Sequence, residues 1–277
     1  MERLPDVRVG WTALQYLIMR AAFFGTIYNN YLALEAALHD ARKRGADVIH
    51  CLGDVGGFGP HPNRSLELLR AEAIPTVQGN YDDSVGNEKP DCGCGYTDPR
   101  DNHYARISYA YTLEKTSSVH RPWLSALPRH VAFEAEGSRY LLVHGSPRQV
   151  NEFLWESTSP DHFLEQLLTN ARADVLLCTH TGIHWQRRLP SGRWVVNVGA
   201  LGRPANDGRV EVWYAFLDTS RTDAPFELIP MRYNHQRLAR EMREEKLPEE
   251  FIQTVLTGWW TTCLEILPAK ERMRGRF

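Results

Sequence analysis

Between residues 20 and 80, short apolar runs alternate with segments whose apolar residues recur at helical spacing. Apolar runs over 21–24, 47–52 and 74–78 are separated by helical patterns over 31–43 and 63–71. This alternation predicts strands joined by helical crossovers, which is typical of an α/β fold. In such a sheet the loops at the carboxyl ends of the strands carry the chemistry.

The second half of the chain is rich in strands. One helix, near 160–171, accompanies apolar runs over 131–135, 139–144, 174–179, 184–188, 193–198, 210–217 and 226–230. Residues 83–129 show little strand pattern, so we expect an inserted cap with helix around 104–127. We further expect an N-terminal extension (1–18), a main domain (19–255) and a C-terminal tail (256–277), with helical segments over 237–246 and 248–256.

Composition is that of an ordinary globular protein. The 277 residues are 43% hydrophobic and 24% charged, enough for one full core. A formal net charge of −2 gives no support for a nucleic-acid partner, whereas a small anionic substrate needs only local positive charge. No apolar run approaches the roughly 18 residues of a membrane span, and no signal peptide pattern begins the chain. We therefore expect a cytoplasmic protein that does not contact membranes.

Side chains that can bind metals follow four of the predicted strands. Asp54 follows 47–52, Asn80 follows 74–78, His144 follows 139–143 and His180 follows 174–178. Either histidine alone would more often be a core residue, but their order at strand ends indicates a site. Carboxylate, amide oxygen and imidazole ligands suit Mn, Fe, Zn, Co or Ni.

Around these side chains the sequence resembles the calcineurin-like metallophosphoesterases, particularly their compact bacterial branch. The matched stretches are LGDVGGFGP (52–60), QGNYD (78–82), LVHGSP (142–147), THT (179–181) and NVG (197–199). The resemblance spans about residues 19–255. It implies a four-layer αββα sandwich with a small inserted cap and a metal-dependent hydrolase of phosphomono- or phosphodiesters.

The resemblance also implies which side chains bind metal. Members of this family hold two metals, and the ligands of the second metal correspond to Asp54, Asn80, His144 and His180. The first metal requires an Asp-x-His pair and the last histidine of Gly-His-x-His, but this chain has Thr26, Tyr28 and Gly182 there. The family's catalytic histidine is Tyr81 here, and a phenol with a pKa of about 10 is a poorer acid near neutral pH.

Three hypotheses follow for this altered site. In the first, one metal supports hydrolysis with Asp54, Tyr81 and Tyr28 in catalytic roles, Asn30 and His184 near the substrate, and Arg148 and Arg203 clamping a phosphate. A surface role for both arginines is equally open. In the second, Tyr28 binds a second metal and His184 could complete its site, while the alternative for Tyr28 is a hydrogen-bonded filler of the vacated space. In the third, the protein binds a phosphorylated or metal-bound ligand without hydrolysing it.

The predicted cap contains two cysteines, Cys92 and Cys94, on either side of one glycine. This pair could contact substrate, chelate a soft metal or form a redox disulfide, while simple loop packing is the alternative. Cys263 could join them if the tail folds over the cap. The adjacent Trp259 and Trp260 predict core packing or a contact between the two copies of a homodimer.

Overall fold

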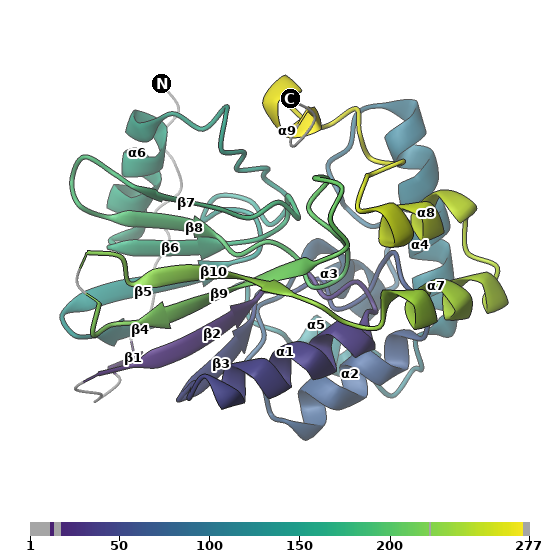
Figure 1. The fold of residues 1–277 in the computed structure, drawn as a ribbon, viewed down its shortest axis with the longest axis horizontal. Coiled ribbons are helices and arrows are strands. Elements are labelled where there is room, and N and C mark those ends of the chain that lie inside the picture. Colours follow the sequence, from purple (N-terminus) through teal and green to yellow (C-terminus); the bar gives the residue numbers. More distant parts are fainter. Residues whose placement is uncertain (1–11, 14–17, 222, 274–277) are drawn as a thin grey trace.

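The predicted α/β sandwich is confirmed by the computed structural model, which describes residues 12–13, 18–221 and 223–273. Within these ranges one sheet contains β1 (Thr12–Ala13), β4 (His130–Ala135), β5 (Ser138–Val143), β6 (Val175–Cys178), β7 (Trp185–Arg188) and β8 (Trp194–Asn197). The other contains β2 (Arg20–Phe24), β3 (Val48–Cys51), β9 (Val212–Asp218) and β10 (Phe226–Met231). The strand orders are β1-β4-β5-β6-β8-β7 and β10-β9-β2-β3. Figure 1 shows the two sheets stacked face to face.

Successive side chains of a strand point to opposite faces of its sheet, and β2 illustrates how this builds the layers. Ala21 and Phe23 lie in the core between the two sheets. Ala22 and Phe24 lie in the core on the other face of their sheet, against α1 (Tyr31–Lys43). β2 therefore contributes to two cores, which illustrates the layered arrangement of the sandwich.

Helices cover the outer faces of both sheets. α1 and α2 (Pro62–Ala71) lie under the smaller sheet, and α6 (Asp161–Ala171) packs on the larger one. The predicted strand over 74–78 is wrong, because only an isolated bridge between Cys51 and Thr76 forms there. Pro75 has no backbone N–H to continue a ladder, and Gln78 donates its own N–H to the Pro128 carbonyl instead.

The predicted cap region contains α3 (Asn80–Gly86), α4 (Pro99–Lys115) and α5 (Arg121–Ser125), so the helix expected around 104–127 is divided in two. α7 (His235–Glu244) and α8 (Glu249–Thr257) lie beside α4, and α9 (Ala269–Arg272) follows. The tail contacts the cap, since the Ile266 N–H donates to Asp101 Oδ2 at 2.9 Å.

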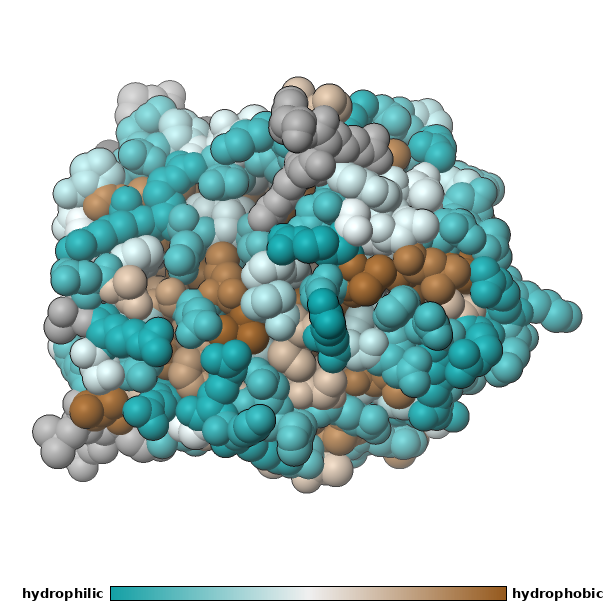
Figure 2. Space-filling model, viewed as in Figure 1, coloured by the Kyte–Doolittle hydropathy of each residue, from teal (hydrophilic) through white to brown (hydrophobic). Residues whose placement is uncertain are grey.

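The division of the chain into domains stays a prediction. Of the expected extension over 1–18, only residues 12–13 and 18 lie among the described residues, and Thr12–Ala13 pair with β4. Within the described ranges, no helix has both the length and the apolar character that crossing a bilayer requires. Figure 2 shows hydrophilic residues over most of one face, with hydrophobic residues gathered toward its middle.

Candidate metal centre

Three buried side chains bring metal-binding atoms together at the carboxyl ends of the strands. Asp54 follows β3, His144 follows β5 and His180 follows β6, and their ligand atoms all lie within 4.8 Å of one another. His144 Nε2 lies 3.2 Å from Asp54 Oδ2 and 3.1 Å from His180 Nδ1. Because β5 and β6 are parallel neighbours, both histidines emerge at the same edge of the sheet.

Burial and the Asp54 carboxylate act differently on the two histidines. His144 Nδ1 donates to the Leu52 carbonyl at 2.8 Å, which turns Nε2 toward Asp54 and His180. Burial works against positive charge on His144, yet the Asp54 carboxylate outweighs it and raises the pKa of His144. Burial, together with His144, lowers the pKa of His180 to about 3, so that imidazole is neutral near pH 7. His180 therefore has the neutral imidazole that a metal ligand needs, while the raised pKa of His144 shows that the space beside Asp54 favours positive charge.

Asn80 supplies the fourth polar group at this place. Its Nδ2 donates to the Cys92 carbonyl at 2.9 Å, which fixes the orientation of the amide. Asn80 Oδ1 and His180 Nε2 are buried and have no hydrogen-bond partner among the described residues. Leaving buried polar atoms without partners is unfavourable, and a metal ion would satisfy both. The residues present therefore fit one metal ion on the predicted ligands, Asp54, Asn80, His144 and His180.

Asp82, which was not among the predicted site residues, supports the metal centre. Its carboxylate accepts hydrogen bonds from the backbone N–H groups of Asp54 at 2.8 Å, Val55 at 3.0 Å and Gly79 at 2.8 Å. Gly79 is required there, because a Cβ on it would lie 2.2 Å from Asp54 Oδ1. A carboxylate at the third position of a helix that begins after glycine is a known capping pattern and could have identified Asp82.

The positions expected to bind a first metal are occupied differently. Thr26 packs against Thr179, with their hydroxyl oxygens 3.2 Å apart. The phenol of Tyr28 is buried, and burial raises its pKa far above the ordinary value, which disfavours the phenolate form. A Cβ on Gly182 would lie 3.7 Å from the ring of Trp260. These residues do not fit a metal ion.

His184 is the residue that could complete a second metal site with Tyr28. Its ring stacks on Trp213 with centroids 3.7 Å apart. His184 belongs neither to the candidate metal cluster nor to the pocket described below. The roles of His184 as a metal ligand beside Tyr28 and as a substrate contact stay predictions.

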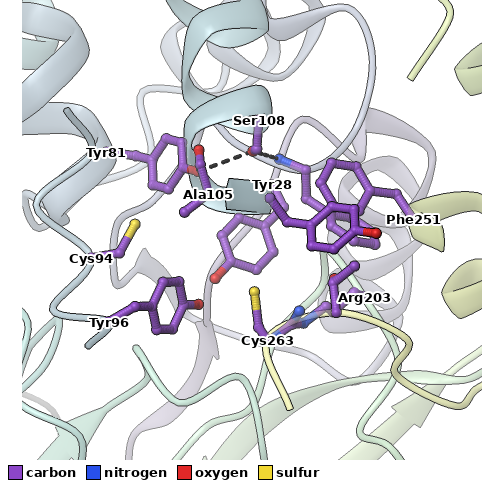
Figure 3. Close-up of a pocket in the computed structure, with 12 residues that line it drawn as sticks. Tyr28, Tyr81, Cys94, Tyr96, Ala105, Ser108, Arg203, Phe251 and Cys263 are labelled. Carbon is purple, nitrogen blue, oxygen red and sulfur yellow. Dashed lines mark hydrogen bonds between the residues drawn. The ribbon is translucent and has the colours of Figure 1, made fainter. Parts of the chain in front are cut away.

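A small pocket, which we call the tyrosine pocket, lies next to the metal centre (Figure 3). Its cavity is about 30 Å³, roughly the room that one water needs. The residues that line it are Tyr28, Phe58, Tyr81, Cys94, Tyr96, Tyr104, Ala105, Ser108, Arg203, Phe251, Thr262 and Cys263. Cys94 connects the pocket to the metal centre, because its Sγ lies 3.5 Å from Asn80 Nδ2.

Cys92 and Cys94 are joined by a disulfide, one of the alternatives that the sequence left open. Cys263 is a free, buried thiol that lines the same pocket as Cys94. The tail therefore reaches the cap as expected. Cys51 and Cys178 are buried free thiols.

Tyr81 lies between the metal centre and α4. Its backbone N–H donates to Asp54 Oδ1 at 2.9 Å, while its hydroxyl donates to Ser108 Oγ at 3.0 Å. Burial raises the pKa of this phenol well above 10, so Tyr81 keeps its proton near neutral pH. A direct part for Tyr81 in proton transfer stays a prediction.

Two residues expected near the substrate have other partners. The Asn30 amide donates to the Leu201 carbonyl at 3.0 Å and accepts from the Ala33 N–H at 3.1 Å, so it caps α1. Both ends of its amide are engaged, and the expectation that Asn30 binds substrate stays a prediction. Arg148 forms an ion pair with Glu152, to which its Nε donates at 2.9 Å.

Trp260 lies inside the chain's own core. Its side chain is 2% exposed, and its Nε1 donates to the Pro204 carbonyl at 2.6 Å. It packs with Trp155 and Ile183. Core packing is therefore the role of Trp260, which is too buried to form a dimer contact.

Comparison with known proteins agrees with this geometry. Residues 19–222 match a family model described as the calcineurin-like phosphoesterase superfamily domain. The chain is 26% identical over 252 residues to the uncharacterized protein MJ0912 of Methanocaldococcus jannaschii, which covers 86% of this chain and 97% of that protein.

Two solved structures share the fold. A metallophosphoesterase from Sphaerobacter thermophilus has 26% identity and a TM-score of 0.67, and the match covers 87% of this chain and 99% of that one. The hypothetical protein PH1004 from Pyrococcus horikoshii OT3 has 22% identity and a TM-score of 0.73, with coverages of 88% and 100%. The protein belongs to the calcineurin-like phosphoesterase superfamily.

Proposed function

We propose that this protein is a metal-dependent phosphoesterase that hydrolyses a phosphomono- or phosphodiester of a small molecule. The observation that supports this most is the convergence of buried ligand atoms on one place, with Asn80 Oδ1 and His180 Nε2 left without partners. We expect one divalent ion of Mn, Fe, Zn, Co or Ni per chain. When bound, such an ion supplies Lewis acidity toward a phosphate oxygen and lowers the pKa of water.

The protein's own groups limit the rest of the chemistry. Tyr28 and Tyr81 keep their protons near neutral pH because burial raises the pKa of both phenols. They can donate hydrogen bonds to a phosphate oxygen, but they give up a proton reluctantly. We therefore expect the fastest substrates to be those whose leaving group is stable as an anion, such as aryl phosphates.

A small anionic substrate agrees with the charge of the chain. The formal net charge of −2 would not attract a nucleic-acid backbone. The local positive charge of Arg203, which is buried in the tyrosine pocket, suits an anion of small size.

A second candidate function is binding of a phosphorylated ligand without hydrolysis. The replacements at the first-metal positions, Thr26, Tyr28 and Gly182, favour it, as does Tyr81 in place of the family's catalytic histidine. Without the first metal and without an acid that titrates near neutral pH, the same site could hold a phosphate and leave the ester intact.

Elemental analysis and two aryl substrates separate the two functions. The purified protein is loaded with Mn²⁺, its metal content is measured, and hydrolysis of p-nitrophenyl phosphate and bis-p-nitrophenyl phosphate is followed. One equivalent of metal with hydrolysis that is lost in His180→Ala, but retained in the exposed His39→Ala control, supports the phosphoesterase. Metal without hydrolysis of either ester supports the binding function, and a protein that holds no metal contradicts both.

A further inference from the structure

We propose that the guanidinium of Arg203 takes the place of the first metal ion and binds an oxyanion of the ligand. This rests on the proposed function and deepens it, because it names a second positive charge for the same site. The ligand class is a phosphate-type oxyanion, which a guanidinium can bind through two parallel hydrogen bonds.

Arg203 is a buried positive charge that lacks an anionic partner. Its side chain is 5% exposed, and its Nε has no hydrogen-bond partner among the described residues. Within the same part of the chain no carboxylate forms an ion pair with it. Burying an unpaired charge is unfavourable, so a site of this kind favours an anion.

Aromatic rings hold the guanidinium in place. Its carbon lies 3.3 Å from the centroid of the Trp260 ring, 5.9 Å from that of Tyr28 and 5.8 Å from that of Phe58. Cation–π contacts stabilise a cation but do not satisfy its N–H groups. These rings therefore position the fork of donors. Cys263 accepts a hydrogen bond from the guanidinium, while the Nε–H is left without a partner among the described residues and is available for a ligand.

The position of Arg203 matches the altered first-metal residues. The backbone N–H groups of Leu201 and Gly202 donate to the Thr26 carbonyl at 3.0 and 2.9 Å. A Cβ on Gly202 would lie 2.3 Å from Tyr28 Cβ, so the segment that carries Arg203 passes directly against the turn at 26–28. Trp260, which stacks on Arg203, is also the ring nearest to Gly182. All three altered positions thus lie around one fixed cation.

The tyrosine pocket places a small cavity with a few polar groups beside this cation, next to the metal centre. Figure 3 shows the hydroxyls of Tyr28 and Tyr96 and the sulfur atoms of Cys94 and Cys263 directed toward a common space beside Arg203. Thr262 Oγ1 also lines the pocket and has no hydrogen-bond partner among the described residues. Since the cavity is about 30 Å³, an entering oxyanion must displace side chains that now close it.

Binding of inorganic phosphate to the Mn²⁺-loaded protein tests the proposal. Calorimetric titration compares the wild type with two variants. Arg203→Met removes the positive charge, whereas Arg203→Lys keeps the charge but cannot form two parallel hydrogen bonds. We expect phosphate affinity to fall at least about ten-fold in both variants, and further in Arg203→Met, with Mn²⁺ stoichiometry unchanged. The matched control is Arg209→Met, because Arg209 lies over Trp213 at 5.3 Å but is paired with Asp207.

The outcomes separate this inference from the proposed function. Phosphate affinity in Arg203→Met equal to that of the wild type, with Mn²⁺ bound, overturns the inference and leaves the metal centre intact. A wild type that binds Mn²⁺ but no phosphate overturns it as well. If Arg203→Met does not fold, wild-type affinity in Arg203→Lys overturns it, and a ten-fold loss supports it. A wild type that holds no Mn²⁺ contradicts the proposed function itself.

Discussion

Replacing His50 by phenylalanine should make the stability of the protein less sensitive to acid. His50 lies in β3 between two aromatic rings, with centroid distances of 5.9 Å to Phe23 and 5.7 Å to Phe133. Its Nδ1 has no hydrogen-bond partner among the described residues, so a proton there would remain unsatisfied. Burial lowers the pKa of His50 from 6.5 to about 4.

The size of the effect follows from these two pKa values. The folded protein keeps His50 neutral, whereas the unfolded chain binds a proton once the pH falls below 6.5. The stability linked to His50 is therefore present above that pH and is lost as the pH falls from 6.5 toward 4. Between about pH 7 and about pH 5 this linkage lowers the free energy of unfolding by about 2 kcal/mol.

Urea unfolding of the metal-free protein, followed by tryptophan fluorescence at both pH values, measures the difference. Wild type should lose about 2 kcal/mol more than His50→Phe over this interval. The exposed His39→Gln serves as a control and should lose as much as wild type. Equal losses in wild type and His50→Phe would refute the argument that His50 is buried in its neutral form.

Further predictions concern the metal centre. Asp82→Asn should lower Mn²⁺ affinity by about 10- to 100-fold in a titration, whereas the neighbouring Asp83→Asn should change it little. Reduction of the Cys92–Cys94 disulfide by dithiothreitol should weaken Mn²⁺ binding, because the Cys92 carbonyl orients Asn80. Peptide mass verifies the reduction, and an unchanged Mn²⁺ affinity in the reduced protein would contradict this prediction. Tyr81→Phe removes the hydrogen bond to Ser108, so it should lower the free energy of unfolding by about 1 kcal/mol and leave Mn²⁺ binding unchanged. A fall in kcat of about 100-fold or more would instead identify Tyr81 as a general acid in hydrolysis.

The parts of the fold that could be predicted from sequence are those set by local periodicity. α1 occupies the predicted range 31–43, because the apolar spacing there is helical and Asn30 caps the first turn. The positions of the candidate metal ligands were also predictable from local pattern, since each ligand follows an apolar run that forms a strand or an extended segment. The strand predicted over 74–78 does not form, because the apolar pattern does not take into account that Pro75 lacks a backbone N–H.

Contacts between distant segments could not be predicted in this way. Arg203 and Trp260 are far apart in the sequence, and only the folded tail brings the ring onto the guanidinium. The sequence suggested a phosphate clamp for Arg203 and a surface role as an alternative, but its burial without a counter-ion depends on packing. Asn30, suggested as a substrate contact, also caps α1, and only its contacts in the folded chain reveal that role.

Restoring the family's first-metal ligands should not restore a second metal. The variant Thr26→Asp, Tyr28→His, Gly182→His contains all three expected side chains, yet Gly182 has φ +70°, a conformation that strains histidine. Its new side chain would also meet the ring of Trp260, which lies 3.7 Å from the Cβ position. The positive charge of Arg203 would repel a cation that enters the space between the three substituted side chains. Elemental analysis should therefore still give about one equivalent of Mn²⁺ per chain, as for a site with a single metal. Two equivalents in this variant would show that Arg203 and Trp260 do not exclude the ion, and the substitution of a metal by a guanidinium would lose its physical basis.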